Sequence, residues 1–191
     1  MRLRKRLLFS SLAVALVASV AIGYVISDRD TSDGSDSVLL DTAHNLDQPL
    51  NTNAAVQGKS LPNAEVKTEQ GDTFQTADLL GQPLIVNIWT STCLPCAKEM
   101  PDLVAAHREF GDRVRFVGID TVPASSVEIT FAKNAGVDYE LFYDGDGRFV
   151  TAAGISTQPV TLFVRADGTI IKQTGQLDAA TLHDTITNEL L

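Results

Sequence analysis

The sequence predicts an α/β domain whose central mixed β-sheet is flanked by helices on both faces. In the middle of the chain, short apolar runs rich in β-branched residues alternate with helical stretches, which is typical of strands buried on both faces. Nearer the C-terminal end, residues 160–175 ("VTLFVRADGTIIKQTG") predict two strands joined by a turn at Asp167-Gly168. An amphipathic helix over residues 177–191 closes the predicted domain.

The remaining elements follow in order along the chain. Residues 64–67 and 73–75, separated by "TEQGD", predict a small β-hairpin extension ahead of the sheet. Residues 83–89 and 114–120 are predicted to be buried strands, and residues 139–144 a short strand. The predicted helices cover the stretch from Cys93 to about Gly111 and residues 125–135, and residues 148–153 are predicted to form one or two helical turns.

The N-terminal segment is predicted to be a membrane anchor. Four basic residues lie within the first six positions, and residues 7–26 follow without a single charge. As a helix, such a run would reach roughly 30 Å, enough to cross the hydrocarbon core, and its basic flank would stay in the cytoplasm. We therefore assign residues 1–27 to a signal-anchor helix with an extracytoplasmic body. The alternative is a signal peptide that is cleaved after Ser19-Val20-Ala21, which would give a secreted protein.

The rest of the chain divides into a linker and a domain. Residues 28–60 are polar and acidic without sustained periodicity, which predicts a flexible linker, and residues 61–191 form the predicted domain. All 24 acidic residues lie after Ser27 with only 11 of the 15 basic ones, a formal charge of −13. This charge argues against a nucleic-acid partner.

Cys93 and Cys96 are the only cysteines, so their spacing has to be explained as a metal site, a structural disulfide or a redox pair. Structural zinc needs four ligands, and the three histidines (His44, His107 and His183) show no ligand spacing. A copper site would need a third soft or imidazole ligand that the sequence does not clearly offer. A structural disulfide would close a very short loop and would add little stability.

Placement favours the redox pair. A predicted strand delivers Cys93 to the first turn of a helix, where unpaired backbone N–H groups and the helix dipole favour a thiolate. Pro95 suits the same first turn, because its missing N–H costs nothing there. Cys96 lies one turn further in, within reach of Cys93 but less exposed. Cys93 is therefore the predicted attacking thiol and Cys96 the predicted resolving thiol.

Two motifs carry a family resemblance. Residues 81–103 ("GQPLIVNIWTSTCLPCAKEMPDL") resemble the active-site stretch of the TlpA/ResA-like thiol-disulfide oxidoreductases, a membrane-associated branch of the thioredoxin superfamily. Residues 154–170 ("GISTQPVTLFVRADGTI") are similar to that family's Gly-x4-Pro-x-Thr, strand, Asp-Gly, strand signature. The resemblance covers about residues 61–191 and implies a thioredoxin-like fold.

The resemblance also implies roles for single residues. Pro159 matches the family's cis-proline, which lies against the disulfide and shapes the substrate groove. Trp89 matches a Trp before the motif, either as core packing or as active-site support. Glu99 matches an acidic residue near the active site of some relatives; it is either a solvated surface residue or a group that shifts thiol pKa values.

The sequence departs from the family at positions around the groove. Thr92 stands where many relatives have Trp, and Gln158 stands where Val or Thr is usual, so both bear on substrate preference. Leu94 and Pro95 separate the cysteines, where the dipeptide tunes the redox potential of such proteins. Asn87 occupies the position of the buried Asp of thioredoxin and cannot act as a base.

The function implied is extracytoplasmic thiol-disulfide exchange through Cys93 and Cys96, with no organic cofactor. Family resemblance favours the reduction of protein disulfides, commonly the haem-attachment cysteines of apocytochrome c, with electrons from a membrane protein. A general disulfide oxidant and a copper-binding assembly factor are the alternatives. A thiol peroxidase is a further alternative. Its peroxidatic Cys is preceded by Pro and Thr residues that build its pocket, and residues 91–93 ("STC") match this pattern poorly.

Overall fold

The computed structural model describes residues 52–191, and within this range the strands form one seven-stranded mixed sheet of order β2-β1-β5-β4-β3-β6-β7. The strands are β1 (Glu65–Lys67), β2 (Thr73–Gln75), β3 (Leu84–Trp89), β4 (Arg115–Asp120), β5 (Glu140–Tyr143), β6 (Val160–Val164) and β7 (Ile170–Thr174). The helices are η1 (Thr76–Leu79), α3 (Leu94–Phe110), α4 (Ser126–Asn134), α5 (Arg148–Ala152), α6 (Ala179–Thr185) and the π-helical turn η2 (Ile186–Leu190).

The pairing of the strands confirms the predicted mixed sheet. β3, β4 and β5 run parallel, whereas β6 and β7 add antiparallel strands beside β3. β1 and β2 form the predicted hairpin, and a single bridge between Lys67 and Tyr143 joins it to β5. The parallel strands direct their carboxyl ends to one edge of the sheet, and β3 passes from there into α3.

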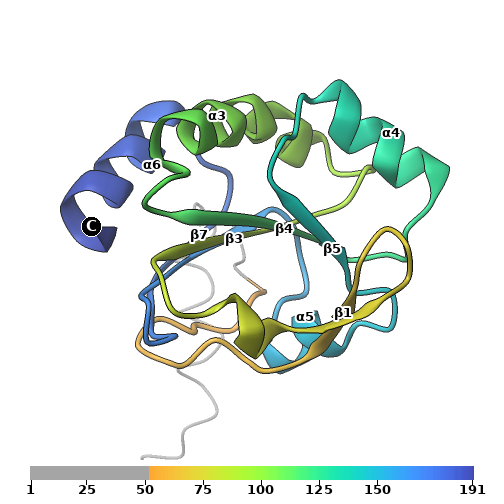
Figure 1. Ribbon diagram of the computed structural model, residues 1–191, viewed down its shortest axis with the longest axis horizontal. Helices are drawn as coiled ribbons and strands as arrows, with labels where there is room; N and C mark the ends of the chain where they lie inside the picture. Colours follow the sequence, from red (N-terminus) through yellow and green to blue (C-terminus); the bar gives the residue numbers. More distant parts are fainter. Residues whose placement is uncertain (1–51) are drawn as a thin grey trace, which may run out of the picture. The chain divides into compact units, whose positions relative to one another are not determined.

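Helices cover both faces of this sheet, so its central strands are buried on both sides. α3, α4 and α6 lie above the sheet in Figure 1, and α5 lies below it. Ile85 of β3 packs upward with residues of α3 and α6, while its neighbours Leu84 and Val86 pack downward with Phe149 of α5. Every residue of β3 is buried, as its apolar sequence predicts.

The last helix begins two residues later than the periodicity predicts. Asp178 caps it, because the Asp178 carboxylate accepts a hydrogen bond from the backbone N–H of Thr181 (2.8 Å). Leu177 is consequently left in the connecting segment, where it is 6 % exposed and its backbone N–H is available to a partner outside the helix.

Residues 52–60, which the sequence assigns to the linker, pack against the domain. Val56 is 5 % exposed, and the backbone N–H of Ala54 donates to the carbonyl of Gly154 (2.8 Å). The composition of the segment is polar, and its contacts are made by one apolar side chain, by polar side chains and by backbone groups, so no apolar pattern reveals them in the sequence. Residues 28–51 of the predicted linker and the predicted anchor helix lie outside the described residues. Within residues 52–191, no helix has the length and apolar character needed to span a membrane.

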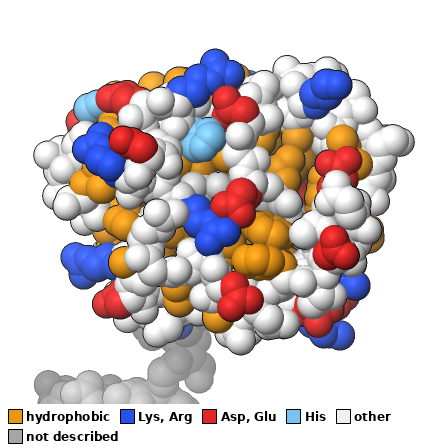
Figure 2. All heavy atoms as spheres, in the orientation of Figure 1, with side chains coloured by type: hydrophobic (Ala, Val, Ile, Leu, Met, Phe, Trp, Pro, Cys, Tyr) orange, Lys and Arg blue, Asp and Glu red, His pale blue; other side chains and the backbone are white. Residues whose placement is uncertain are grey.

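Charged side chains of both signs are interspersed on the face shown in Figure 2, with hydrophobic atoms visible between them. Several of the charges on the described surface are paired. Arg115 binds Glu140 through two hydrogen bonds of 2.7 and 2.8 Å, and Lys172 binds Glu189 at 2.6 Å. These exposed pairs contribute little stability individually, about 0–1 kcal/mol each.

Candidate active site

The turn between β3 and α3 presents the two cysteines. Cys93 is the N-cap residue of α3, in an extended backbone conformation, and its sulfur accepts a hydrogen bond from the backbone N–H of Cys96 (3.1 Å). The two sulfurs are joined in a disulfide at 2.02 Å. The sulfur of Cys93 therefore lies where the unpaired N–H groups of a helix end can stabilise a thiolate after reduction.

The two cysteines differ in their access to solvent. Cys96 is 0 % exposed, whereas Cys93 is partly exposed. Leu94 between them is 78 % exposed, and Pro95, at the second helical position, is also exposed. Cys93 is therefore the cysteine that a protein substrate can reach, and exposed apolar surface of Leu94 lies directly beside it.

A second loop meets the cysteine turn at the same edge of the sheet. The Gln158–Pro159 peptide bond is cis, as the family resemblance implies. Val160 pairs with Ile88, so Pro159 lies at the level of the end of β3, from which the cysteine turn departs. Pro159 is buried, Gln158 is partly buried and Thr92 is exposed, so Thr92 and Gln158 can contact a bound substrate.

The N-terminal segment holds this proline loop in place. The side-chain oxygen of Asn53 accepts hydrogen bonds from the backbone N–H groups of Ser156 (2.7 Å) and Thr157 (2.9 Å). Its side-chain N–H₂ donates to the carbonyl of Thr157 (3.0 Å). Sequence reasoning placed Asn53 in the linker, and no local pattern could have revealed it, because its partners are more than 100 residues away.

Glu99 is not the surface residue that its helical position allowed. It is 1 % exposed, on the inward face of α3 one turn after Cys96. One carboxylate oxygen accepts from the side-chain N–H₂ of Asn87 (2.7 Å), and the other accepts from the backbone N–H of Leu177 (2.9 Å). Burial raises the pKa of Glu99, and these two hydrogen bonds oppose the rise.

Asn87 has a function in this arrangement that sequence reasoning missed. Its side-chain N–H₂ donates to Glu99 and also to the hydroxyl of Thr161 on β6 (3.1 Å). Asn87 therefore links the central strand, the cysteine-bearing helix and the strand that follows the cis-proline. The comparison with the buried Asp of thioredoxin directs attention to this position but does not name its partners.

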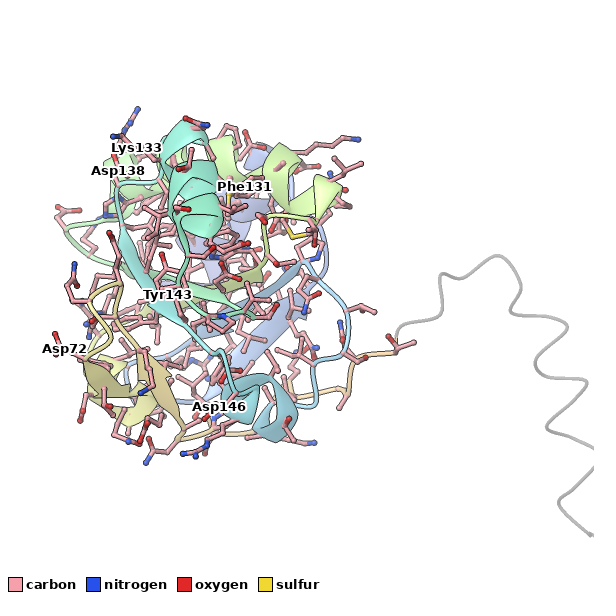
Figure 3. All side chains as sticks on the ribbon, turned by 90° about the vertical axis from the view of Figure 1, so that its right-hand side faces the viewer. Asp72, Phe131, Lys133, Asp138, Tyr143 and Asp146 are labelled. Atoms are coloured by element: carbon pink, nitrogen blue, oxygen red, sulfur yellow. A yellow bond between two sulfur atoms is a disulfide. The ribbon has the colours of Figure 1, made fainter. Side chains whose placement is uncertain are left out.

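Trp89 closes the core beneath the cysteine turn. It is 0 % exposed, clusters with Cys96 and Met100, and its ring stacks on that of Phe131 from α4 (centroids 5.5 Å apart, planes 15° apart). Figure 3 shows Phe131 on α4, above Tyr143 of β5, and the disulfide as a yellow bond at the start of α3. Trp89 therefore fills the space between the cysteine-bearing helix and α4.

Two buried carboxyl groups, Asp120 and Glu128, lie behind the cysteine turn, and sequence reasoning singled out neither. Glu128 of α4 accepts hydrogen bonds from the backbone N–H (2.9 Å) and the hydroxyl (2.6 Å) of Ser91. Asp120 ends β4 and is 0 % exposed, and burial, with a contribution from the neighbouring Glu128, raises its pKa to about 8. In the sequence both look like ordinary acidic residues of a strongly acidic chain.

The side chains at this edge suit sulfur chemistry. Within residues 52–191, no three His, Cys, Asp or Glu residues gather in a way that could hold a metal ion. The accessible sulfur of Cys93 and the second sulfur bonded to it are the groups that thiol-disulfide exchange uses, and the cis-proline loop lies on the neighbouring strand.

Comparisons with known proteins agree with this chemistry. Residues 57–173 match the AhpC/TSA family, a match that covers more than half of the chain. The chain belongs to that family. It is 25 % identical to the thiol-disulfide oxidoreductase ResA of Bacillus subtilis over 183 residues, covering 95 % of this chain and 92 % of that protein. It is 28 % identical to the thiol:disulfide interchange protein DsbE of Escherichia coli over 128 residues, 65 % of this chain and 68 % of that protein.

A solved structure supports the same assignment within the AhpC/TSA family. The structure of a secreted Mycobacterium tuberculosis disulfide oxidoreductase, described as homologous to E. coli DsbE, superposes with a TM-score of 0.55 at 28 % identity. The match covers 62 % of this chain and 90 % of that one. The resemblance to TlpA/ResA-like proteins is therefore confirmed, and this AhpC/TSA family member is a thiol-disulfide oxidoreductase with Cys93 and Cys96 as its Cys-x-x-Cys pair.

Proposed function

We propose that this oxidoreductase works outside the cytoplasm, anchored by its N-terminal helix, and reduces disulfides in exported proteins, with apocytochrome c as the preferred substrate. The observation that carries the proposal is the unequal exposure of the two sulfurs. Cys96 is 0 % exposed and Cys93 is partly exposed beside the protruding Leu94. A buried resolving sulfur next to an accessible one suits a substrate that is itself a polypeptide.

The reaction proceeds in two thiol-disulfide exchange steps. In the reduced enzyme, the Cys93 thiolate attacks one sulfur of the substrate disulfide, and the other substrate sulfur leaves as a thiolate. Cys96 then loses its proton and attacks Cys93, which re-forms the Cys93–Cys96 disulfide and releases the second substrate sulfur. The substrate gains two electrons and two protons, and a membrane dithiol protein returns both to the enzyme. The cysteine pair itself carries the electrons, so no organic cofactor is required.

Direction and location rest on sequence. The family resemblance favours reduction, and the basic start followed by 20 uncharged residues favours an anchor with the domain outside. The related M. tuberculosis oxidoreductase is described as secreted, which agrees with an extracytoplasmic domain. Protease added to intact cells should degrade the domain, and the purified membrane form should retain residues before Ala21. N-terminal sequencing that begins near Ile22 would instead show that the segment is cleaved.

A trapping experiment tests the assigned sulfur roles and names the substrate. Cys96→Ser leaves the attacking thiol in place but removes the group that releases the product, so covalent complexes with exported proteins should accumulate and dissolve in dithiothreitol. Cys93→Ser is the matched control and should trap almost nothing, because the remaining sulfur is buried. Equal trapping by the two variants would contradict the roles, and trapped partners other than cytochromes would contradict the proposed substrate.

The reduction potential of the Cys93–Cys96 couple decides the direction. A value near that of thioredoxin, about −270 mV, supports a reductant, whereas a value near −120 mV supports a general oxidant. Titration against glutathione and dithiothreitol buffers measures it directly.

A further inference from the structure

The turn that carries Cys93 is tied to α4 by a buried carboxylate. Both oxygens of the Glu128 side chain are used: one accepts from the backbone N–H of Ser91 (2.9 Å) and the other from the Ser91 hydroxyl (2.6 Å). Glu128 is only 7 % exposed, and Ser91 lies two residues before Cys93. Hydrogen bonds to a charged acceptor in such surroundings are about twice as strong as neutral ones.

A second carboxyl group stands beside the first. Asp120 is 0 % exposed; one oxygen accepts from the backbone N–H of Val122 (3.1 Å) and no group within the described residues donates to the other. The Glu128 carboxylate is close enough to accept a hydrogen bond from Asp120 only when Asp120 is protonated. The backbone N–H of Thr121 donates to the carbonyl of Trp89 (3.1 Å), so the end of β4 is joined to the start of the cysteine turn. Like charges held this close cost free energy when both groups are ionised.

We propose that Glu128 is a positioning residue for thiol-disulfide exchange, which fixes the Ser91 turn and thereby the placement of Cys93, and that Asp120 supports it by holding a proton. The inference rests on the exchange chemistry and not on its direction, substrate or location. Glu128 touches neither sulfur nor substrate. It acts through Ser91.

The titratable groups around Asp120 and Glu128 do not neutralise the negative charge of the two carboxyl groups. Tyr143 of β5 pairs in register with Asp120, and its buried hydroxyl has no partner within the described residues. Glu69, from the turn between β1 and β2, is the other charged group acting on Tyr143. No Lys, Arg or His forms an ion pair with Asp120 or Glu128 among residues 52–191, so a proton on Asp120 is what limits the negative charge there.

The turn matters for reactivity because Cys93 depends on its position at the helix end. The N–H of Cys96 points at its sulfur, and this contact exists only while Cys93 occupies the N-cap position. If the Ser91 tie is lost, the sulfur moves more freely relative to the helix end, and the thiolate is stabilised less.

The sign of the effect separates positioning from plain electrostatics. Removing a nearby negative charge would by itself favour the Cys93 thiolate and lower the pH midpoint of its alkylation. Loss of the fixed position of Cys93 would instead stabilise its thiolate less and raise the pH midpoint of its alkylation. In the reduced Glu128→Gln and Glu128→Ala variants, we expect the midpoint of Cys93 alkylation by iodoacetamide to rise, and the rate at pH 7 to fall about tenfold. A midpoint that falls or stays unchanged overturns the proposal.

A double-mutant cycle shows whether the effect runs through Ser91. Ser91→Ala removes the hydroxyl contact but leaves the charge and the backbone contact, so a smaller loss of about threefold is expected. Adding Ser91→Ala to Glu128→Ala should produce no further loss, because the two act as one unit. Fully independent losses in the double variant would overturn the proposal.

A matched control addresses the stability of α4. Ser125 caps that helix by accepting from the backbone N–H of Glu128 (3.4 Å), and its side chain has no hydrogen bond to the cysteine turn within residues 52–191. Ser125→Ala should destabilise α4 while leaving the alkylation midpoint unchanged. A shift as large as that of Glu128→Ala would show that helix stability alone explains the result.

The role of Asp120 is tested in the oxidised protein, where neither cysteine titrates. The backbone amide resonance of Ser91 should move with pH, with a midpoint near the Asp120 pKa of about 8. Asp120→Asn should abolish this titration while the remaining resonances keep their folded positions. A Ser91 resonance that does not titrate, or that titrates equally in Asp120→Asn, contradicts the proton-holding role.

Discussion

Two buried acidic sites flank the cysteine turn, and they are built on opposite plans. On the inner face of α3, Glu99 has a hydrogen-bond donor for each of its oxygens, and the acidic residue that acts on it, Asp102, is partly exposed. Behind the turn, Asp120 and Glu128 lie side by side, and one oxygen of Asp120 has no donor among the described residues. At the first site, hydrogen-bond donors stabilise the buried carboxylate of Glu99. At the second site, the buried carboxyl group of Asp120 avoids the cost of a second negative charge by keeping its proton. The first should therefore matter most for stability, and the second should make the enzyme sensitive to pH.

Glu99→Ala should have the largest effect on stability. The substitution leaves one N–H of the Asn87 side chain and the Leu177 N–H buried without an acceptor and opens a small cavity, which together cost about 4 kcal/mol; the other Asn87 N–H keeps its bond to Thr161. Urea unfolding of the oxidised protein measures the loss. Glu99→Gln, which keeps the volume and one acceptor, should lose about half as much. A loss below about 1 kcal/mol for the Ala variant would mean that water replaces the carboxylate.

Asp120→Asn should change the pH dependence of stability. Because the folded-state pKa of about 8 lies above the ordinary value of 3.8, the stability that the bound proton confers is fully present below pH 4 and is lost as pH rises through 8. The wild type should therefore lose up to about 1.4 kcal/mol per pH unit from this group between pH 5 and 8. Thermal unfolding across this range should be flatter in Asp120→Asn, and an equal slope in both proteins would contradict the assignment.

Asn87→Ala should cost less, about 1.5 kcal/mol at pH 7, because Glu99 keeps its contact with Leu177. The hydrogen bond from Asn87 opposes the rise in the pKa of Glu99, so its removal should raise that pKa further. The destabilisation should shrink in acid, where Glu99 is protonated in both proteins. The same cost at pH 4 and pH 7 would show that packing, and not the bond to the carboxylate, is what Asn87 supplies.

Ser91→Ala should be the mildest of the four for stability, at about 1 kcal/mol or less. Ser91 is partly exposed, and Glu128 keeps its bond to the backbone N–H. Urea unfolding in parallel with the alkylation assay would show reactivity changing more than stability. A large loss of stability would show that Ser91, like Glu99, contributes mainly to stability, and it would contradict the distinction between the two sites.

Much of the fold could be predicted because it depends on patterns within short stretches of the sequence. The all-buried β3, the turn at Asp167-Gly168 and the alternation of strands with helices are patterns within single stretches of chain. The cysteine pair is likewise local, and the resemblance supplied the cis bond at Pro159 and directed attention to Glu99 without deciding whether it is buried. None of these required knowledge of which strand lies beside which.

The residues that were missed are defined by contacts across the fold. Glu128 meets Ser91 across 37 residues, Leu177 meets Glu99 across 78, and Asn53 meets Ser156 across 103. Buried and solvent-exposed acidic residues cannot be distinguished by residue type, so composition does not show which acidic residues are buried. Burial distinguishes them, and burial follows from the order of strands in the sheet.

The packed N-terminal segment has a further consequence, for the solubility of the domain. β7 is the last strand at one margin of the sheet, and residues 58–61 pair with residues 168–170 at its beginning. Gly58 donates its backbone N–H to the carbonyl of Ile170 (2.8 Å), and the N–H of Ile170 donates to the carbonyl of Lys59 (2.9 Å). An uncovered strand margin is a template for pairing with another molecule. A domain cut to begin at residue 61 would uncover these groups and invite self-association through β7, whereas one that begins at residue 52 keeps them covered.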